Sequence, residues 1–286
     1  MSSIADIPQR WLRRVSAIFN WKKLDRIRHR LTAGGSPCFD AGRCFLPEWA
    51  YLSADPQTRN IARRVCSGIR SGDEKQLMRL MAEIRRNPQT VALLSIRRQI
   101  AAWRMTKDIV EIDPHMLSAL IESDADSLPA ELLLRLPSWG LYISLTDGFP
   151  QPDGVQEPVR GVFVRYADRS PAPGSRVPVL LEAVFCCGEN GEKVIPPITI
   201  DPATKTISEA MFPSCSTLPG MDTFELLFGP VQKAARRMGE PVIRALVAIL
   251  LYVVSEHEKR TDARSPSTPQ IPSPGKARGW RMIPPK

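Results

Sequence analysis

The sequence has little histidine and none of the short motifs that identify common enzyme classes. Its 286 residues include only three histidines, His29, His115 and His257, which we interpret as surface or capping residues. There is no G-x-S-x-G nucleophile elbow, no Walker phosphate loop and no H-E-x-x-H zinc motif. We therefore expect a non-enzymatic protein, with no catalytic residue, no metal and no cofactor.

Long apolar runs are also missing. The first 20 residues contain Arg10, Arg13 and Arg14 and no continuous apolar stretch, unlike a secretory signal peptide. The longest apolar run is 245–254, whereas a helix needs about 20 apolar residues to cross a bilayer. We expect a buried core helix at this run, and a protein of the bacterial cytoplasm that has no membrane partner.

The six cysteines lack the C-x-x-C spacing of zinc and redox sites. Cys186 and Cys187 are adjacent, so in a strand they would point to opposite faces of the sheet. Because no secretory signal precedes them, we expect reduced thiols.

Carboxylates are the remaining candidates for a metal site. Glu122, Asp124 and Asp126 stand at alternate positions, as in loops that hold hard cations. The stretch lacks the glycine and the distal glutamate of a calcium loop, so we interpret it as a solvated helix end. Glu182 and Glu192 suggest a divergent metal nuclease, although the E-x-K spacing is absent.

The charge present in the chain is unevenly distributed. The net charge is +9, but residues 1–104 carry 20 Lys and Arg against 8 Asp and Glu, and residues 105–230 carry 8 against 18. Residues 231–286 are basic again. Two explanations stay open: the basic N-terminal part binds an anionic partner, or it pairs with the acidic middle of the same chain.

Hydrophobic periodicity predicts an α+β fold with a helical N-terminal part, a small antiparallel sheet of about four strands, two C-terminal helices and a disordered tail. Asn190-Gly191 is typical of a hairpin turn within the sheet. The predicted divisions are a basic amphipathic helix in 1–35, a single domain in 36–258 (helical 56–122, sheet 139–200, helices 221–258) and a Pro/Ser-rich basic tail in 259–286.

The basic helix, expected at 8–31, is the first binding candidate. Interleaved Trp11, Phe19 and Trp21 would stack on bases while cations grip phosphates. The alternative is an apolar core-packing stripe flanked by solvated arginines. The nucleic-acid-binding candidates are Arg13, Arg14, Lys22, Lys23, Arg26 and Arg30.

A second candidate is an aromatic-bearing strand that follows a proline-rich turn. An exposed sheet edge here would accept an added peptide strand, whereas the alternative places the aromatic rings in the core. The partner-binding candidates are Trp103, Arg104, Leu136, Pro137, Trp139, Tyr142, Phe163 and Tyr166.

Short segments spread over residues 40–258 carry a family resemblance. They are Cys44-Phe45-Leu46-Pro47 with Ala50-Tyr51, Trp103-Arg104 followed by Ile109 and Asp113, Leu136-Pro137-x-Trp139-x-x-Tyr142, Gly161-Val162-Phe163 with Tyr166, and Leu250-Leu251-Tyr252-Val253 with Glu256. On these segments the chain resembles the type V-A anti-CRISPR family, whose members lower production of the effector nuclease by promoting destruction of its messenger RNA.

The resemblance implies a protein of a phage or plasmid that recognises a nascent effector polypeptide and triggers loss of its mRNA, with RNA or the ribosome as further partners. This chain stops at Lys286, short of the Arg-, His- and Trp-rich tail that the family carries after the position of Gly279-Trp280-Arg281. The alternatives are a basic nucleic-acid-binding regulator or maintenance protein of a mobile element, and a divergent metal-dependent nuclease. The oligomeric state is unknown from the sequence.

Overall fold

The computed structural model describes residues 6–33, 48–57, 59–60, 64, 75, 79, 88–145, 149–168, 179–195, 197–211, 239–261 and 278–282. The helices are α1 (Asp6–Ser16), α2 (Trp21–Ala33), α3 (Glu48–Ala54), α6 (Pro88–Thr106), α7 (Pro114–Ile121), α8 (Ile207–Met211) and α10 (Glu240–Thr261), with a 3₁₀ turn at Ala130–Arg135. The strands are β1 (Asp108–Ile112), β2 (Gly140–Ser144), β3 (Val159–Asp168), β4 (Val179–Cys187), β5 (Lys193–Val194), β6 (Ile198–Ile200) and β7 (Arg278–Met282).

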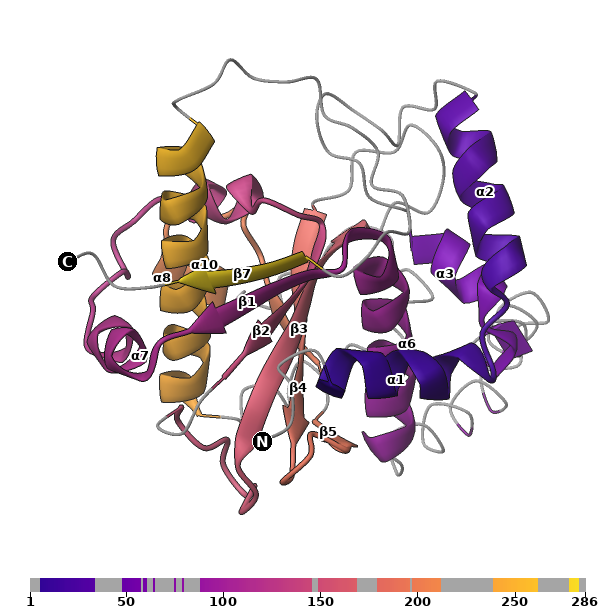
Figure 1. The fold of residues 1–286 in the computed structure, drawn as a ribbon, viewed down its shortest axis with the longest axis horizontal. Coiled ribbons are helices and arrows are strands. Elements are labelled where there is room, and N and C mark those ends of the chain that lie inside the picture. The colour runs from indigo at the N-terminus through magenta and orange to yellow at the C-terminus, as the bar shows by residue number, and fades with distance from the viewer. Residues whose placement is uncertain are drawn as a thin grey trace.

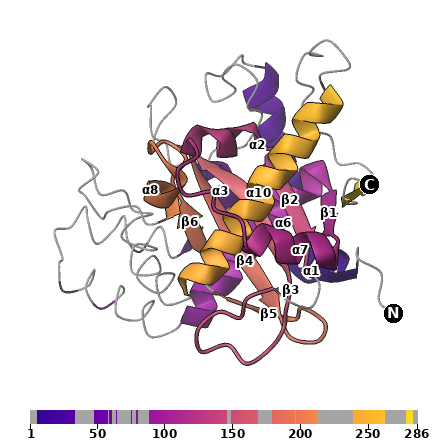
Figure 2. The same ribbon diagram turned by 90° about the vertical axis from the view of Figure 1, so that its left-hand side faces the viewer.

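A seven-stranded mixed sheet forms the centre of the fold. Its strand order is β5-β4-β3-β2-β1-β7, and β6 pairs with β4 beside β5. β1 pairs in parallel with both β2 and β7, whereas β2, β3 and β4 form an antiparallel meander. Figures 1 and 2 show the sheet between α6 on one side and α10 on the other. Because helices cover both faces, apolar residues on either face of the central strands are buried.

Local sequence accounts for the ends of the two covering helices. α6 ends at Thr106, and the next residue, Lys107, has a positive φ of 53°, the left-handed conformation common after a helix C-terminus. α10 begins after Gly239, with Pro241 in its first turn. Residues 245–254 lie within α10 and are mostly buried, as predicted for a core helix. Within the described residues, no helix has the length and apolar character needed to span a membrane.

The α+β class is confirmed, but several predicted elements differ. The sheet is larger than about four strands and is not purely antiparallel. β1 forms inside the stretch 56–122, which was predicted to be helical, because Ile109, Val110 and Ile112 are β-branched and pair with β2. Residues 278–282 of the predicted disordered tail form β7. The predicted helix at 221–238, most of 61–87 and the tail residues 262–277 lie outside the described residues.

The single basic helix predicted at 8–31 is two helices. The break follows α1, and Asn20 starts α2: its side chain accepts a hydrogen bond from the Lys23 backbone N–H at 3.0 Å. Asparagine is a preferred N-cap residue because its side-chain oxygen satisfies an otherwise unpaired N–H of the first turn. The Asn20 backbone N–H also donates to the Ala54 carbonyl at 3.0 Å, which ties the break to α3.

Gly161 in β3 is required by a close contact with the Tyr142 ring. A Cβ at this position would lie 2.0 Å from the Tyr142 hydroxyl oxygen, and Tyr142 is fully buried against Phe163, with ring centroids 4.7 Å apart. We expect Gly161→Ala to lower the free energy of unfolding by about 1–3 kcal/mol, as overpacking does in cores. Urea denaturation measures it. The same substitution in a Tyr142→Ala background should cost much less, and an equal cost in both backgrounds would contradict this contact.

Candidate functional site

The aromatic residues predicted to form a peptide-binding edge lie in the core. Trp103, Tyr142 and Phe163 are 0% exposed, and Trp139 and Tyr166 are also buried. The remaining members of the set are Leu136 (buried), Pro137 (half-buried) and Arg104 (half-buried). The structure thus corrects the expectation of an exposed aromatic edge, because the helices on both faces of the sheet cover these rings.

The buried aromatic side chains have structural contacts that explain their positions. The Trp103 indole N–H donates to the Asp108 carbonyl at 2.9 Å, across the turn between α6 and β1. The Tyr166 hydroxyl donates to the Leu133 carbonyl at 2.8 Å and accepts from the Leu136 N–H at 3.1 Å. Tyr166 therefore attaches the 3₁₀ turn to the sheet.

The two basic helices form an arm that is held against the body at both ends. In α1, Arg10 donates to the Asn190 carbonyl at 2.7 Å, and the Trp11 indole N–H donates to the Gly191 carbonyl at 2.8 Å. Both acceptors belong to the hairpin turn between β4 and β5, which the Asn-Gly pair predicted. The guanidinium of Arg14 lies 5.1 Å from the Trp11 ring centroid, a cation–π distance.

An ion pair attaches α2 to α6. The two Arg104 amino groups contact the two Asp25 carboxylate oxygens at 2.9 and 3.0 Å, a bidentate arrangement. The same guanidinium lies 4.9 Å from the Trp21 ring centroid, and Trp21 packs on Phe19 with centroids 4.6 Å apart. Since Trp11 and Phe19 are buried and Trp21 is half-buried under Arg104, the interleaved rings do not form the predicted base-stacking face.

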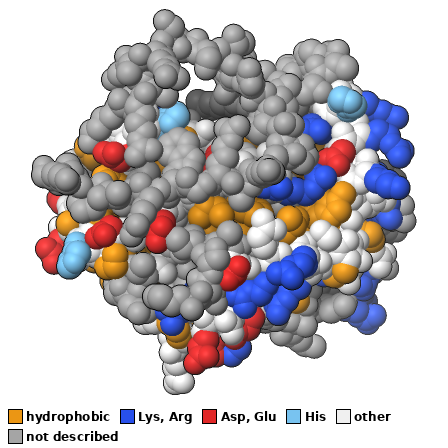
Figure 3. Space-filling model, viewed as in Figure 1, with side chains coloured by type: hydrophobic (Ala, Val, Ile, Leu, Met, Phe, Trp, Pro, Cys, Tyr) orange, Lys and Arg blue, Asp and Glu red, His pale blue; other side chains and the backbone are white. Residues whose placement is uncertain are grey.

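The outer side of the arm carries most of the predicted nucleic-acid-binding cations. Figure 3 shows Lys and Arg side chains gathered where α1 and α2 lie in Figure 1. Arg13, Lys22, Arg26 and Arg30 are exposed. Arg14 is exposed and donates to the Glu192 carbonyl at 3.4 Å, and Lys23 is half-buried.

Two acidic residues of the middle segment, Glu182 and Glu157, form ion pairs away from α2 in the described part of the chain. Glu182 lies between Arg98 and Arg165, with N–O distances of 3.2 and 2.5 Å. All three side chains are buried. Glu157 pairs with Lys193. The Arg98–Glu182 pair joins the basic N-terminal part to the acidic middle, as the intramolecular explanation predicts. Within the described ranges, however, neither Glu182 nor Glu157 pairs with a cation of α2.

The carboxylates considered as metal ligands make other contacts. Glu182 is compensated by two guanidinium groups, and a Glu192 carboxylate oxygen accepts from the Asn190 N–H at 3.0 Å. The described residues contain no group of three or more His, Cys, Asp or Glu arranged to hold a metal ion. In the described structure, Glu182 and Glu192 are therefore engaged by protein groups and belong to no such cluster.

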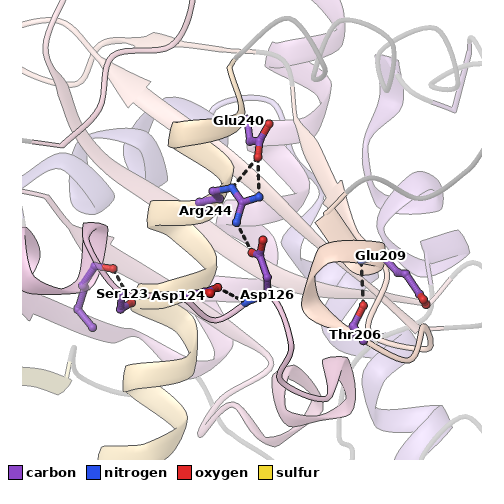
Figure 4. Close-up of polar contacts among 8 residues, drawn as sticks. Ser123, Asp124, Asp126, Thr206, Glu209, Glu240 and Arg244 are labelled. Atoms are coloured by element: carbon purple, nitrogen blue, oxygen red, sulfur yellow. Dashed lines mark hydrogen bonds and ion pairs between the residues drawn. The ribbon is translucent and has the colours of Figure 1, made fainter.

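The acidic stretch after α7 is bound to α10 through an ion pair, as Figure 4 shows. Asp126 forms an ion pair with Arg244 of α10, and Arg244 also contacts Glu240 at 2.6 Å. The hydrogen bonds to these carboxylates raise the pKa of Arg244 above its ordinary value. An Asp124 carboxylate oxygen accepts from the Asp126 N–H at 3.1 Å, which shapes the turn. Asp126 is thus paired, not merely solvated.

The adjacent cysteines of β4 are both free and buried. Burial raises the pKa of the Cys187 thiol to about 12, and burial also raises the pKa of Cys186. Both thiols therefore stay protonated at neutral pH, and a protonated thiol is a poor nucleophile.

Sequence reasoning missed the residues that position the arm and pair the buried charges. Asp25 could have been singled out from the sequence as an ion-pair partner, because it is the only acidic residue within 21–33. Arg98 and Arg165 could not have been singled out, since a sequence does not distinguish a buried arginine from a solvated one.

A family model and a solved structure are similar to this chain. The model of the anti-CRISPR type V subtype A2 family (AcrVA2-like) matches residues 110–286. A solved structure, the crystal structure of AcrVA2, is similar with a TM-score of 0.50 and 17% identity, over 84% of this chain and 68% of that chain. At this identity the likeness concerns the fold. None of the curated proteins compared with the chain matches it.

Proposed function

This chain belongs to the anti-CRISPR type V subtype A2 family, and on that premise we propose that it recognises the nascent polypeptide of a type V-A effector nuclease and triggers loss of the encoding mRNA. The family match, which includes β2 to β7 and α10, is the observation that carries the proposal. In this mechanism the protein binds and recruits, and works inside a bacterium that a phage or plasmid has entered.

The described structure supports a binding role over a catalytic one. Its buried charges are used in pairs, Asp55 with Arg97 and Glu182 with two arginines. Its buried cysteines are protonated. A co-opted host nuclease would then carry out the cleavage of the message.

Comparison of two effector messages tests the proposal. One message carries an intact effector reading frame, and the other carries a single-nucleotide insertion after the start codon, so that nearly the same RNA encodes a different polypeptide. Both are expressed with and without the protein, and message levels are measured by quantitative reverse transcription. We expect loss of the intact message alone, because the signal is the nascent chain.

Sedimentation provides a second readout for the same proposal. The protein should co-sediment with polysomes translating the intact message and should leave them when puromycin releases the nascent chains. Equal loss of both messages would show that the RNA itself is recognised, and an unchanged level of both would contradict the mechanism altogether.

A further inference from the structure

We infer that the outer side of α2 is a binding site for the phosphodiester backbone of a nucleic acid, contacted by Lys22, Arg26 and Arg30. We call these three residues the α2 basic stripe. The inference does not rest on the proposed recognition of a nascent polypeptide. It concerns residues outside the range 110–286 that the family model matches.

Helix geometry places the three cations in one row. They stand at positions i, i+4 and i+8 of α2, so they share one side of the helix and follow one another at about 6 Å along its axis. Phosphates along one strand of a duplex are spaced about 3.4 Å apart. A row of flexible cationic side chains at this interval can therefore contact neighbouring or alternate phosphates.

The stripe is cationic and is not neutralised within the described part of the chain. All three side chains are exposed, and none of them forms an ion pair or side-chain hydrogen bond there. Residues 21–33 contain five Lys or Arg and a single acid, Asp25, whose two carboxylate oxygens are both bound by Arg104. The helix is thus positive on the side that faces away from the body.

The contacts on the inner side of α2 hold the stripe in place. Leu24 is 0% exposed, and the bidentate Asp25–Arg104 pair fixes the helix against α6. Because Leu24 and the Asp25–Arg104 pair attach α2 to the body, the stripe is presented by a docked helix and does not need to order on binding. A pre-organised surface loses less entropy when a ligand binds.

The same packing favours a nucleic acid over a membrane surface. An interfacial helix inserts an apolar face among lipid headgroups, but in α2 Leu24 is buried and Trp21 and Ile27 are half-buried against the core. Among the described residues, the large hydrophobic side chains that are exposed are Ile18 and Leu128, neither of which belongs to α2. Because Trp11, Phe19 and Trp21 pack inward, the contact is with phosphates and is independent of base sequence.

Two triple variants with the same change in net charge test the site. Lys22→Glu/Arg26→Glu/Arg30→Glu reverses the stripe, and Lys75→Glu/Arg79→Glu/Lys205→Glu reverses three exposed cations elsewhere. Binding of a fluorescent oligouridylate RNA and of a DNA duplex is measured by anisotropy between about 50 and 200 mM salt. Three phosphate contacts to a single strand contribute a slope of about −2 in log K against log salt, or about 20-fold in affinity over this range.

We expect the stripe variant to lose that slope and the control variant to keep it. A charge-conserving variant, Lys22→Arg/Arg26→Lys/Arg30→Lys, should bind like the wild type, and circular dichroism should show the same helix content in all four proteins. The affinities for the RNA and for the DNA duplex are then compared, and the higher affinity indicates which kind of nucleic acid supplies the phosphates. No salt-dependent binding by the wild type, equal losses in both charge-reversed variants, or binding only to phosphatidylserine vesicles would each overturn the inference.

Discussion

Replacing Glu182 with glutamine should lower the free energy of unfolding by about 3–5 kcal/mol, the cost of removing one partner from a buried ion pair. Glu182 is buried in β4 between Arg98 of α6 and Arg165 of β3. The substitution keeps the shape of the side chain but removes the charge, so two buried guanidinium groups face a neutral amide. The loss would be a large share of the 5–15 kcal/mol that typically separates folded from unfolded protein.

Urea denaturation followed by circular dichroism measures this effect, with Glu189→Gln as the matched control. Glu189 undergoes the same chemical change seven positions away in an exposed hairpin turn, where a change within about 0.5 kcal/mol is expected. If both variants unfold at the same urea concentration, the buried carboxylate does not hold α6 to the sheet.

Replacing Trp103 with alanine should cost a similar amount, about 3–5 kcal/mol, because it removes a fully buried indole and leaves a cavity. Trp103 is 0% exposed, meets Phe163 edge-on with ring centroids 6.3 Å apart, and donates to the Asp108 carbonyl. Trp103→Phe should cost less, since the phenyl ring fills part of the space but cannot supply the hydrogen bond.

The natural comparison is Trp21→Ala, which removes the same side chain from a half-buried position. We expect a smaller loss there, measured by the same denaturation curves. The experiment also separates the two interpretations of Trp103 that the sequence allows. If Trp103 belonged to a peptide-binding surface, its alanine variant would fail to lower the effector message while keeping the stability of the wild type. That outcome would contradict its placement in the core.

The position of α1 and α2 suggests that two parts of the chain bind different partners. The region matched by the family, 110–286, contains most of the sheet and α10. The basic stripe lies outside it, on a helix fixed to α6 by Asp25 and Arg104. In the proposal, effector recognition belongs to the family-matched region, and α2 adds affinity for a polyanion that is always present near a translating ribosome.

Some of this architecture follows from local sequence. The Asn190-Gly191 turn, the core helix within α10 and the α+β class were all predicted, because turn residues and hydrophobic periodicity act over a few neighbouring positions. The family segments were also visible, since Leu136-Pro137-x-Trp139-x-x-Tyr142 is a short contiguous pattern. The break between α1 and α2 was missed because Asn20 acts as a cap within a continuing apolar periodicity.

The sequence by itself determined the fold class, the hairpin and the segregation of charge, because each depends on residue type and spacing along the chain. Only the tertiary structure decided that Trp139 and Tyr142 are buried, since a pattern shows that a face is apolar but not that a helix covers it. It also decided which charges remain available on α2. Asp25 meets Arg104 across 79 positions, and Glu182 meets Arg98 across 84, so no local rule could tell these paired side chains from the exposed Lys22 and Arg26.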